Sequence, residues 1–339
     1  MFSTLYLHIG QEKTGTTSIQ SFLHANRDAL RDAGIFTPRS LGRENHKALA
    51  AYAFDEGSGD ISVTSVRAPH KSGSVEAYRA GVAAALSREV SDSAAQVGVI
   101  SSEDLSRLYT AREVGRVVDL LRPFCKELRI IVLTRRQDLM ASSRYYSFVL
   151  GGSQAVQILP TVDQLTTPPY YDYAHNIGLW ADAVGDANVI LRRFPERPSR
   201  AGFNSVRTFC GILGLDAAAY QMVQRQHVSL DAVNQIILQN YNALTQNPDP
   251  AGIERLKDQL VLQNDSTLRY ISSRAQAERF YAHFHADNQA LFRRLKAEDE
   301  AFSLDFSMYP KENMRTRFQR QAIQRLLALL TRSDAETET

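Results

Sequence analysis

The chain has 339 residues, of which 44% are hydrophobic and 22% are charged, a composition typical of a globular protein with a full core. The formal net charge of +2 argues against a nucleic-acid partner, because it leaves room only for a local basic surface. No run approaches the roughly 18 apolar residues that a transmembrane helix needs, and no signal-like segment precedes the first predicted strand, so we expect a cytoplasmic protein.

The first predicted elements are a strand and a helix, joined by a turn that suits an anion. Leu5, Leu7 and Ile9 alternate as in a strand, and apolar residues at helical spacing follow from Ile19 onward. The turn therefore lies at a helix N-terminus, where free backbone N–H groups point outward and bind phosphate or sulfate. The residues that we expect to contact the anion are Lys13, Thr14, Gly15, Thr16, Thr17 and Ser18.

The spacing in this turn departs from that of the nucleotide-triphosphate P-loop. Gly10 and Gly15 reproduce the two glycines of G-x-x-x-x-G-K-S/T, but Thr16 holds the lysine position and Lys13 precedes the second glycine. The run from Lys13 to Thr17 instead resembles the 5′-phosphosulfate loop, P-K-S/T-G-T-T/S, of sulfotransferases that use 3′-phosphoadenosine 5′-phosphosulfate (PAPS). Glu12 stands where that family commonly has proline, and a carboxylate beside an anion site is unfavourable unless it points to solvent.

A candidate general base follows the next buried strand, which we predict over 97–100. Glu103 comes shortly after this strand, so it is expected at the same sheet edge as the anion-binding turn. A carboxylate in that place can take the proton of a substrate hydroxyl. A structural alternative stays open, in which Glu103 caps a short helix or pairs with Arg107 four residues later.

A second motif lies over a hundred residues downstream, after a buried strand predicted over 128–133. Arg135 stands at the end of that strand, and Ser143 and Tyr145 follow on the next predicted helix. Arginine offers a fork of donors to a phosphate dianion, and a hydroxyl on the following helix can meet the same group from the other side. The pattern resembles the 3′-phosphate site of the same sulfotransferases. The alternative is a surface helix start with a solvated pair of arginines.

Strands and helices alternate along the chain, which favours a mostly parallel sheet. We therefore predict an α/β fold, a three-layer P-loop-like parallel sheet flanked by helices, with a helical C-terminal part from Ser229 onward. One domain is expected over 1–332, with flexible insertions at about 57–73 and 151–169, before a disordered tail over 333–339. The remaining predicted elements are strands over 34–37 and 189–194 and a helix over 75–90.

Together the two motifs resemble those of PAPS-dependent sulfotransferases, in the bacterial, carbohydrate-type branch. The resemblance implies transfer of the sulfuryl group of PAPS to a hydroxyl of a carbohydrate or other small acceptor, leaving adenosine 3′,5′-bisphosphate (PAP), with no metal required. It implies that Lys13 stabilises the leaving bridge oxygen in a loose, in-line transition state. For the base it offers Glu103, and also His46, which lies in a segment where family members often have a histidine near the acceptor cleft. The acceptor stays open between a sugar, a lipid headgroup and a phenol, and the oligomeric state stays open too.

Two other classes of function are compatible with the same residues. A small-molecule P-loop kinase would use ATP and magnesium, with Asp104 or Glu103 as a ligand of the metal. A non-catalytic nucleotide-binding pseudoenzyme would keep the 3′-phosphate site, while Glu12 would impair transfer.

Overall fold

The computed structural model describes residues 1–58, 60, 63–67, 74–161, 164–165, 169–196, 203–223, 230–245, 249–265 and 267–337. The chain forms two compact units, each described by itself below. The first unit comprises Met1–Arg136, Leu165–Arg225 and His285–Phe302, and the second comprises Gln137–Gln164, Gln226–Phe284 and Ser303–Thr339. The single domain expected over 1–332 stays a prediction, and its two flexible insertions lie partly outside the described residues.

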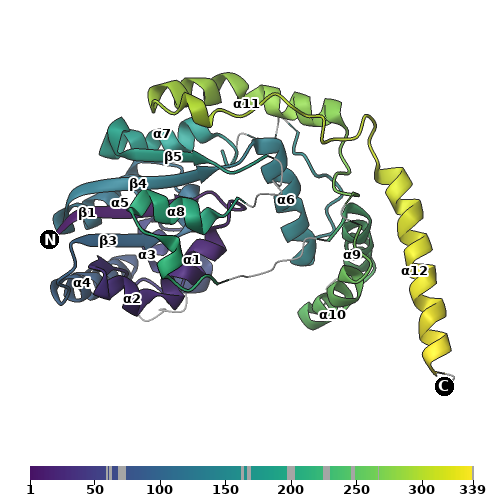
Figure 1. The fold of residues 1–339 in the computed structure, drawn as a ribbon, viewed down its shortest axis with the longest axis horizontal. Coiled ribbons are helices and arrows are strands. Elements are labelled where there is room, and N and C mark those ends of the chain that lie inside the picture. Colours follow the sequence, from purple (N-terminus) through teal and green to yellow (C-terminus); the bar gives the residue numbers. More distant parts are fainter. Residues whose placement is uncertain are drawn as a thin grey trace. The chain divides into compact units, whose positions relative to one another are not determined.

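The first unit is built on a five-stranded sheet in the order β2-β3-β1-β4-β5, and every neighbouring pair is parallel (Figure 1). The α/β fold predicted from the alternation of strands and helices is confirmed. Because β1 lies between β3 and β4, the chain segments that follow these three strands emerge at the centre of one sheet edge. The strands are β1 (Phe2–Gly10), β2 (Ile35–Phe36), β3 (Val97–Ser101), β4 (Cys125–Thr134) and β5 (Val189–Arg193).

Helices cover both faces of this sheet, as a parallel sheet requires. On one face, α1 (Thr16–Ala25), α2 (Arg27–Asp32) and α8 (Ser205–Leu213) pack apolar side chains onto the strands, and α8 lies beside α1 (Figure 1). The His8 side chain of β1 points to this face, where its ring contacts the Phe209 ring of α8. Because side chains alternate along a strand, the neighbouring Leu7 points to the opposite face. That face is covered by α5 (Ala111–Leu121) and α7 (Tyr173–Val184), with α3 (Lys47–Ala53) and α4 (Val75–Ser91) packed further out.

Local sequence explains where these helices begin. Thr110 caps α5, because its hydroxyl accepts the Glu113 N–H at 3.2 Å, and Asp172 caps α7 by accepting the His175 N–H at 2.9 Å. In α5 the buried residues recur at helical spacing, so one stripe of the helix faces the core. These residues are Val114, Val117, Val118 and Leu121.

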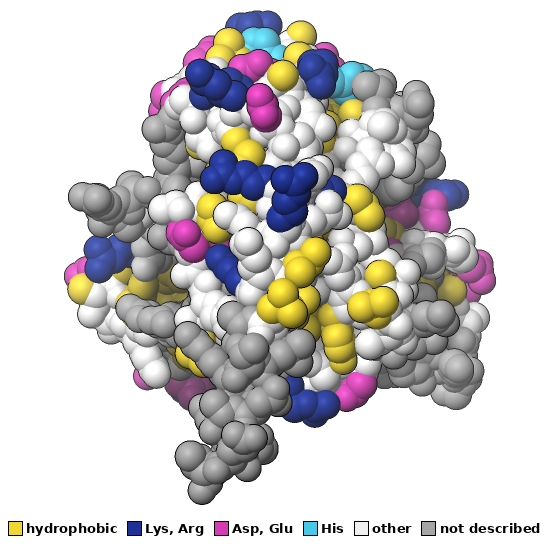
Figure 2. All heavy atoms as spheres, turned by 90° about the vertical axis from the view of Figure 1, so that its right-hand side faces the viewer, with side chains coloured by type: hydrophobic (Ala, Val, Ile, Leu, Met, Phe, Trp, Pro, Cys, Tyr) yellow, Lys and Arg dark blue, Asp and Glu magenta, His cyan; other side chains and the backbone are white. Residues whose placement is uncertain are grey.

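The second unit is helical, as predicted for the C-terminal part. Its helices are α6 (Gln137–Leu150), α9 (Ala232–Thr245), α10 (Pro250–Val261), most of α11 (Arg274–Arg294) and α12 (Arg315–Thr337). Its core includes Tyr145, Ile236 and Phe318, and Arg325 is paired with the buried Asp231 at 2.7 Å. Figure 2, in which the right-hand side of Figure 1 faces the viewer, shows hydrophobic side chains exposed between basic ones.

The C-terminal helix continues further than the sequence suggests. Disorder is predicted over 333–339, but α12 is helical through Thr337, and 338–339 lie outside the described residues. Within the described part of the chain, no helix has the length and apolar character needed to cross a bilayer.

Candidate functional site

The loop between β1 and α1 has a backbone that only particular residues tolerate. Gly10, Lys13 and Gly15 have positive φ angles of 84°, 62° and 86°. A Cβ atom on Gly10 would lie 2.8 Å from the Glu103 Cβ, and one on Gly15 would lie 2.7 Å from the Ser205 Cβ. The two glycines are therefore required both for conformation and for close approach. Lys13 carries a side chain, so its left-handed backbone conformation is strained and costs roughly 1–3 kcal/mol. Such strain is typical of functional loops.

Hydrogen bonds hold this loop on the sheet edge. The Gln11 N–H donates to the Leu133 carbonyl at 3.1 Å, and the Thr14 hydroxyl donates to the Gln11 carbonyl at 2.6 Å. The Arg135 guanidinium donates to the Lys13 carbonyl at 3.3 Å, which ties the first motif to the second. Among the residues that the structure describes, no side chain caps α1, and the Ser18 N–H donates to the Gly15 carbonyl at 3.0 Å. The predicted anion-binding residues are thus gathered at an uncapped helix start.

The buried Thr14 differs from the other hydroxyl residues of the turn. Its side chain is 0% exposed and its hydroxyl donates to the Gln11 carbonyl, so the hydroxyl shapes the loop, and the contact of Thr14 with an anion stays a prediction. Thr17 and Ser18 are partly exposed at the start of α1, and the Lys13 side chain is partly exposed as well.

Glu103 lies at the same edge, against Gly10, as its position after β3 predicts. The Gln20 amide donates to one of its carboxylate oxygens, and the Asn45 amide donates to the same oxygen at 3.3 Å. Burial raises the pKa of the Glu103 carboxyl, and the nearby charges of Asp104 and Glu12 raise it further, against the lowering effect of the Gln20 hydrogen bond. A carboxyl group with a raised pKa beside an anion-binding loop is suited to proton transfer.

His46 is placed differently from the sequence expectation. Its side chain is 1% exposed, and its Nδ1 accepts the Ser101 backbone N–H at 3.0 Å. Nδ1 is therefore unprotonated, and the remaining ring nitrogen carries the proton beside the Pro38 backbone. Burial lowers the His46 pKa to about 3. The ring links the loop before α3 to β3 and has no lone pair left for a substrate proton.

Glu12, which stands where the loop of the resembled sulfotransferases has proline, is paired with a buried arginine. Arg107 is paired with Glu12 at 2.6 Å, with Asp60 at 2.7 Å and with Asp104 at 2.5 Å, and its own side chain is only 11% exposed. The second Glu12 oxygen accepts the Tyr170 hydroxyl at 2.6 Å. Burial opposes the charge of Arg107, but its carboxylate partners raise the Arg107 pKa above its ordinary value. We call these five residues the Arg107 cluster.

This cluster changes the interpretation of the residues around Glu103. Arg107 ends the short turn after β3, Glu103–Arg107, and it pairs with Asp104 of the same turn and with Glu12 and Asp60 from two other segments. Asp104, a magnesium ligand in the kinase alternative, is held by Arg107 and by the Asn45 amide at 3.1 Å. Among the described residues, no group of three or more His, Cys, Asp or Glu side chains is arranged to hold a metal ion.

The residues of the second motif belong to different units. In the first unit, the Arg135 guanidinium lies over the Phe194 ring at 5.3 Å, and the Tyr173 hydroxyl donates to the Arg135 carbonyl at 2.7 Å. Arg136 is fully buried and paired with Glu196 at 3.0 Å, so the alternative of a solvated arginine pair is wrong for Arg136.

Ser143 and Tyr145 lie on α6 in the second unit. There the buried Tyr145 ring is part of the apolar core, and its hydroxyl accepts a hydrogen bond from Arg315 at 3.4 Å. The 3′-phosphate site as a whole stays a prediction from the sequence.

Comparison with known proteins gives little similarity. No protein-family model matches the chain, and no curated protein sequence matches it. Among solved structures, the chain is similar to a crystal structure described as a sulfotransferase from Alicyclobacillus acidocaldarius, with 17% sequence identity and a TM-score of 0.44. The match covers 85% of this chain and 95% of that chain. A similarity of this strength does not by itself assign a family or an activity.

Proposed function

We propose that this protein is a PAPS-dependent sulfotransferase that transfers a sulfuryl group to the hydroxyl of a small acceptor. The observation that supports the proposal most is the left-handed Lys13, held between two obligatory glycines at the uncapped start of α1, next to a carboxyl group with a raised pKa. Such a loop provides backbone donors and one cation for an anionic group, and the adjacent carboxyl provides a base.

The residue roles follow from the chemistry of the transfer. The acceptor oxygen forms a bond to sulfur while the bond from sulfur to the bridge oxygen breaks, and the electron pair of that bond stays on PAP. Lys13 stabilises the charge that develops on the bridge oxygen. The first N–H groups of α1, with Gly15, Thr16, Thr17 and Ser18, hold the 5′-phosphate, and Arg135 and Ser143 hold the 3′-phosphate.

Glu103 is the base that we propose to accept the proton of the acceptor hydroxyl. Its raised pKa brings its proton affinity closer to neutral pH than that of an ordinary glutamate. His46 is less suited, because its Nδ1 lone pair is occupied by Ser101 and the ring is buried. We therefore assign His46 a structural role.

The Arg107 cluster bears on the pseudoenzyme alternative. That alternative rested on an uncompensated Glu12 charge beside the anion site, whereas both Glu12 oxygens have partners and one of these partners is a cation. The carbohydrate acceptor and the cytoplasmic location stay predictions, and the oligomeric state stays open.

The proposed function is tested by comparing PAP with ATP and magnesium in a thermal-shift titration. PAP without metal is expected to raise the melting temperature, since a ligand at about 100 times its Kd stabilises the folded state by about 2.7 kcal/mol. Arg135→Ala should abolish the PAP-induced rise in melting temperature. The matched control is Arg129→Ala, which should keep this rise, because Arg129 is a partly exposed arginine on β4 that pairs with Glu127. Stabilisation by ATP and magnesium but not by PAP would establish the kinase alternative instead.

A further inference from the structure

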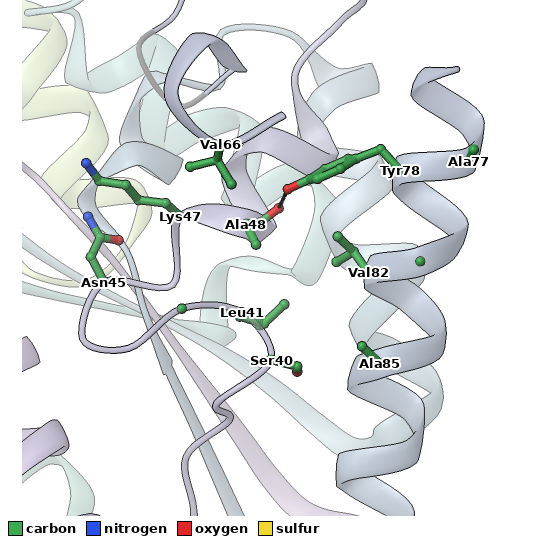
Figure 3. Close-up of a pocket in the computed structure, with 12 residues that line it drawn as sticks. Ser40, Leu41, Asn45, Lys47, Ala48, Val66, Ala77, Tyr78, Val82 and Ala85 are labelled. Carbon is green, nitrogen blue, oxygen red and sulfur yellow. Dashed lines mark hydrogen bonds between the residues drawn. The ribbon is translucent and has the colours of Figure 1, made fainter. Parts of the chain in front are cut away.

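A pocket of about 660 Å³ lies between α4, the start of α3 and the loop before it (Figure 3). Its volume is in the range of small-molecule sites. Apolar side chains form most of the wall, among them Leu41, Ala48, Val66 and Val82. The Tyr78 hydroxyl, which also borders the pocket, donates to the Ala48 carbonyl at 3.3 Å and is therefore already used.

Two polar side chains, Asn45 and Lys47, line the same side of this pocket, as Figure 3 shows. Lys47 is a partly buried residue, and within the described part of the chain no hydrogen bond or ion pair reaches its ammonium. The Asn45 side-chain oxygen is buried and has no hydrogen-bond partner there either. A partly buried cation and a buried acceptor that lack partners indicate a ligand with an anionic group and a donor group.

Asn45 also connects the pocket to the proposed base. Its amide nitrogen donates to Glu103 at 3.3 Å and to Asp104 at 3.1 Å, while its oxygen is left without a partner. An acceptor hydroxyl that donates to this buried oxygen, after a rotation of the Asn45 side chain uncovers it, would lie next to Glu103. Arg107 pairs with Asp104, but it pairs with Glu12 and Asp60 as well, so this one cation offsets only part of the negative charge of the three carboxylates.

We propose that this pocket binds the acceptor, and that the acceptor is an amphiphilic anion: an apolar body along α4, a carboxylate or similar anion at Lys47, and the reacting hydroxyl at Asn45. The inference rests on the proposed function, because it places the hydroxyl beside the proposed base. The wall formed by Val82 and its apolar neighbours carries few hydrogen-bonding side chains, the Ser40 hydroxyl among them, and so suits an apolar body better than the several hydroxyls of a sugar. An anion at Lys47 gains a charge-assisted hydrogen bond that a neutral analogue lacks.

The inference is tested by calorimetric titration of the full chain, with and without PAP. The probes are β-hydroxyoctanoate, its neutral amide and N-acetylglucosamine. We expect the acid to bind at least tenfold more tightly than the amide, and the sugar to bind more weakly than either. Lys47→Met should abolish the difference between acid and amide, whereas Lys126→Met, a change at an exposed lysine on β4, should preserve it. Ala85→Trp, at an exposed position of α4 in the pocket wall, should weaken the binding of both acid and amide.

Equal binding of acid and amide, or an unchanged preference in Lys47→Met, would overturn the inference. Tighter binding of the sugar would do so as well, in favour of the carbohydrate acceptor. Failure of the proposed function has a different signature, since PAP would then not bind to the wild-type chain. If PAP binds but the acid is not sulfated when PAPS is supplied, as judged by the mass of the product, the pocket is not the acceptor site.

Discussion

The Glu12 carboxylate provides the sharpest test of how the anion-binding loop works. A carboxylate beside a phosphate site is expected to weaken anion binding, so its removal would strengthen binding if Glu12 were uncompensated. In the structure, however, Glu12 is held by Arg107 and by the Tyr170 hydroxyl, each at 2.6 Å. We therefore expect Glu12→Gln to loosen the loop, to weaken PAP binding and to lower the stability of the protein.

The size of the effect follows from the contacts that are lost. Hydrogen bonds to charged groups contribute roughly 1.5–3 kcal/mol each, and a glutamine retains one of the two acceptor oxygens. Since the Glu12 side chain is 24% exposed, we expect Glu12→Gln to lower the free energy of unfolding by about one such bond, ~1.5–3 kcal/mol. Arg107→Met leaves three carboxylates without their cation and should cost more, ~3–5 kcal/mol.

The assay combines urea denaturation with calorimetric titration of PAP, for both single variants and for the double variant. Coupling between the two sites should appear as non-additive free energies, because Glu12 and Arg107 are in direct contact. The matched control is Glu127→Gln, which removes an exposed carboxylate paired with Arg129, a contact expected to contribute about 0–1 kcal/mol. If Glu12→Gln binds PAP more tightly and is as stable as the wild type, the reasoning is refuted.

Four further outcomes are expected. Lys13→Ala should reduce the turnover number by an amount equivalent to ~2.7–4 kcal/mol while PAP affinity in titration changes less, because PAP lacks the transferring group; an equal loss in both quantities would contradict the role of Lys13. Glu103→Gln should reduce transfer about 100-fold with PAP affinity retained, whereas His46→Asn should mainly lower the melting temperature. Because the folded-state pKa of Glu103 is raised, the contribution of this carboxyl to stability is lost as the pH rises from about 4.5 through that pKa. The urea midpoint of the wild type should therefore fall over this interval relative to the midpoint of Glu103→Gln, which has no carboxyl to titrate. Arg135→Ala should weaken PAP binding by ~2–3 kcal/mol and Ser143→Ala by ~1 kcal/mol, and unchanged affinity in both would show that the second motif is misassigned.

The local elements around the site could be predicted from the sequence because their signals are local. The alternation of Leu5, Leu7 and Ile9 and the helical spacing after Thr16 are properties of neighbouring residues. The positive φ angles at Gly10 and Gly15 are local as well, whereas their close approach to Glu103 and Ser205 comes from the tertiary fold. The parallel sheet follows from the alternation of strands and helices, since consecutive parallel strands need crossovers. Glu103 could be expected near the loop because parallel strands end at the same sheet edge.

The partners of these residues were decided by tertiary structure alone. Arg107 meets Glu12 and Asp60 across 95 and 47 positions of sequence, and no periodicity encodes such a meeting. His46 has the residue type of a base, but its burial and its bond from Ser101 come from packing between two distant segments. The charge of Glu12, unfavourable when judged from the loop alone, is opposed in the fold by a cation from another strand end, which Glu12 shares with Asp60 and Asp104. Such a contact is possible because electrostatic free energy depends on distance in space and not on separation along the chain.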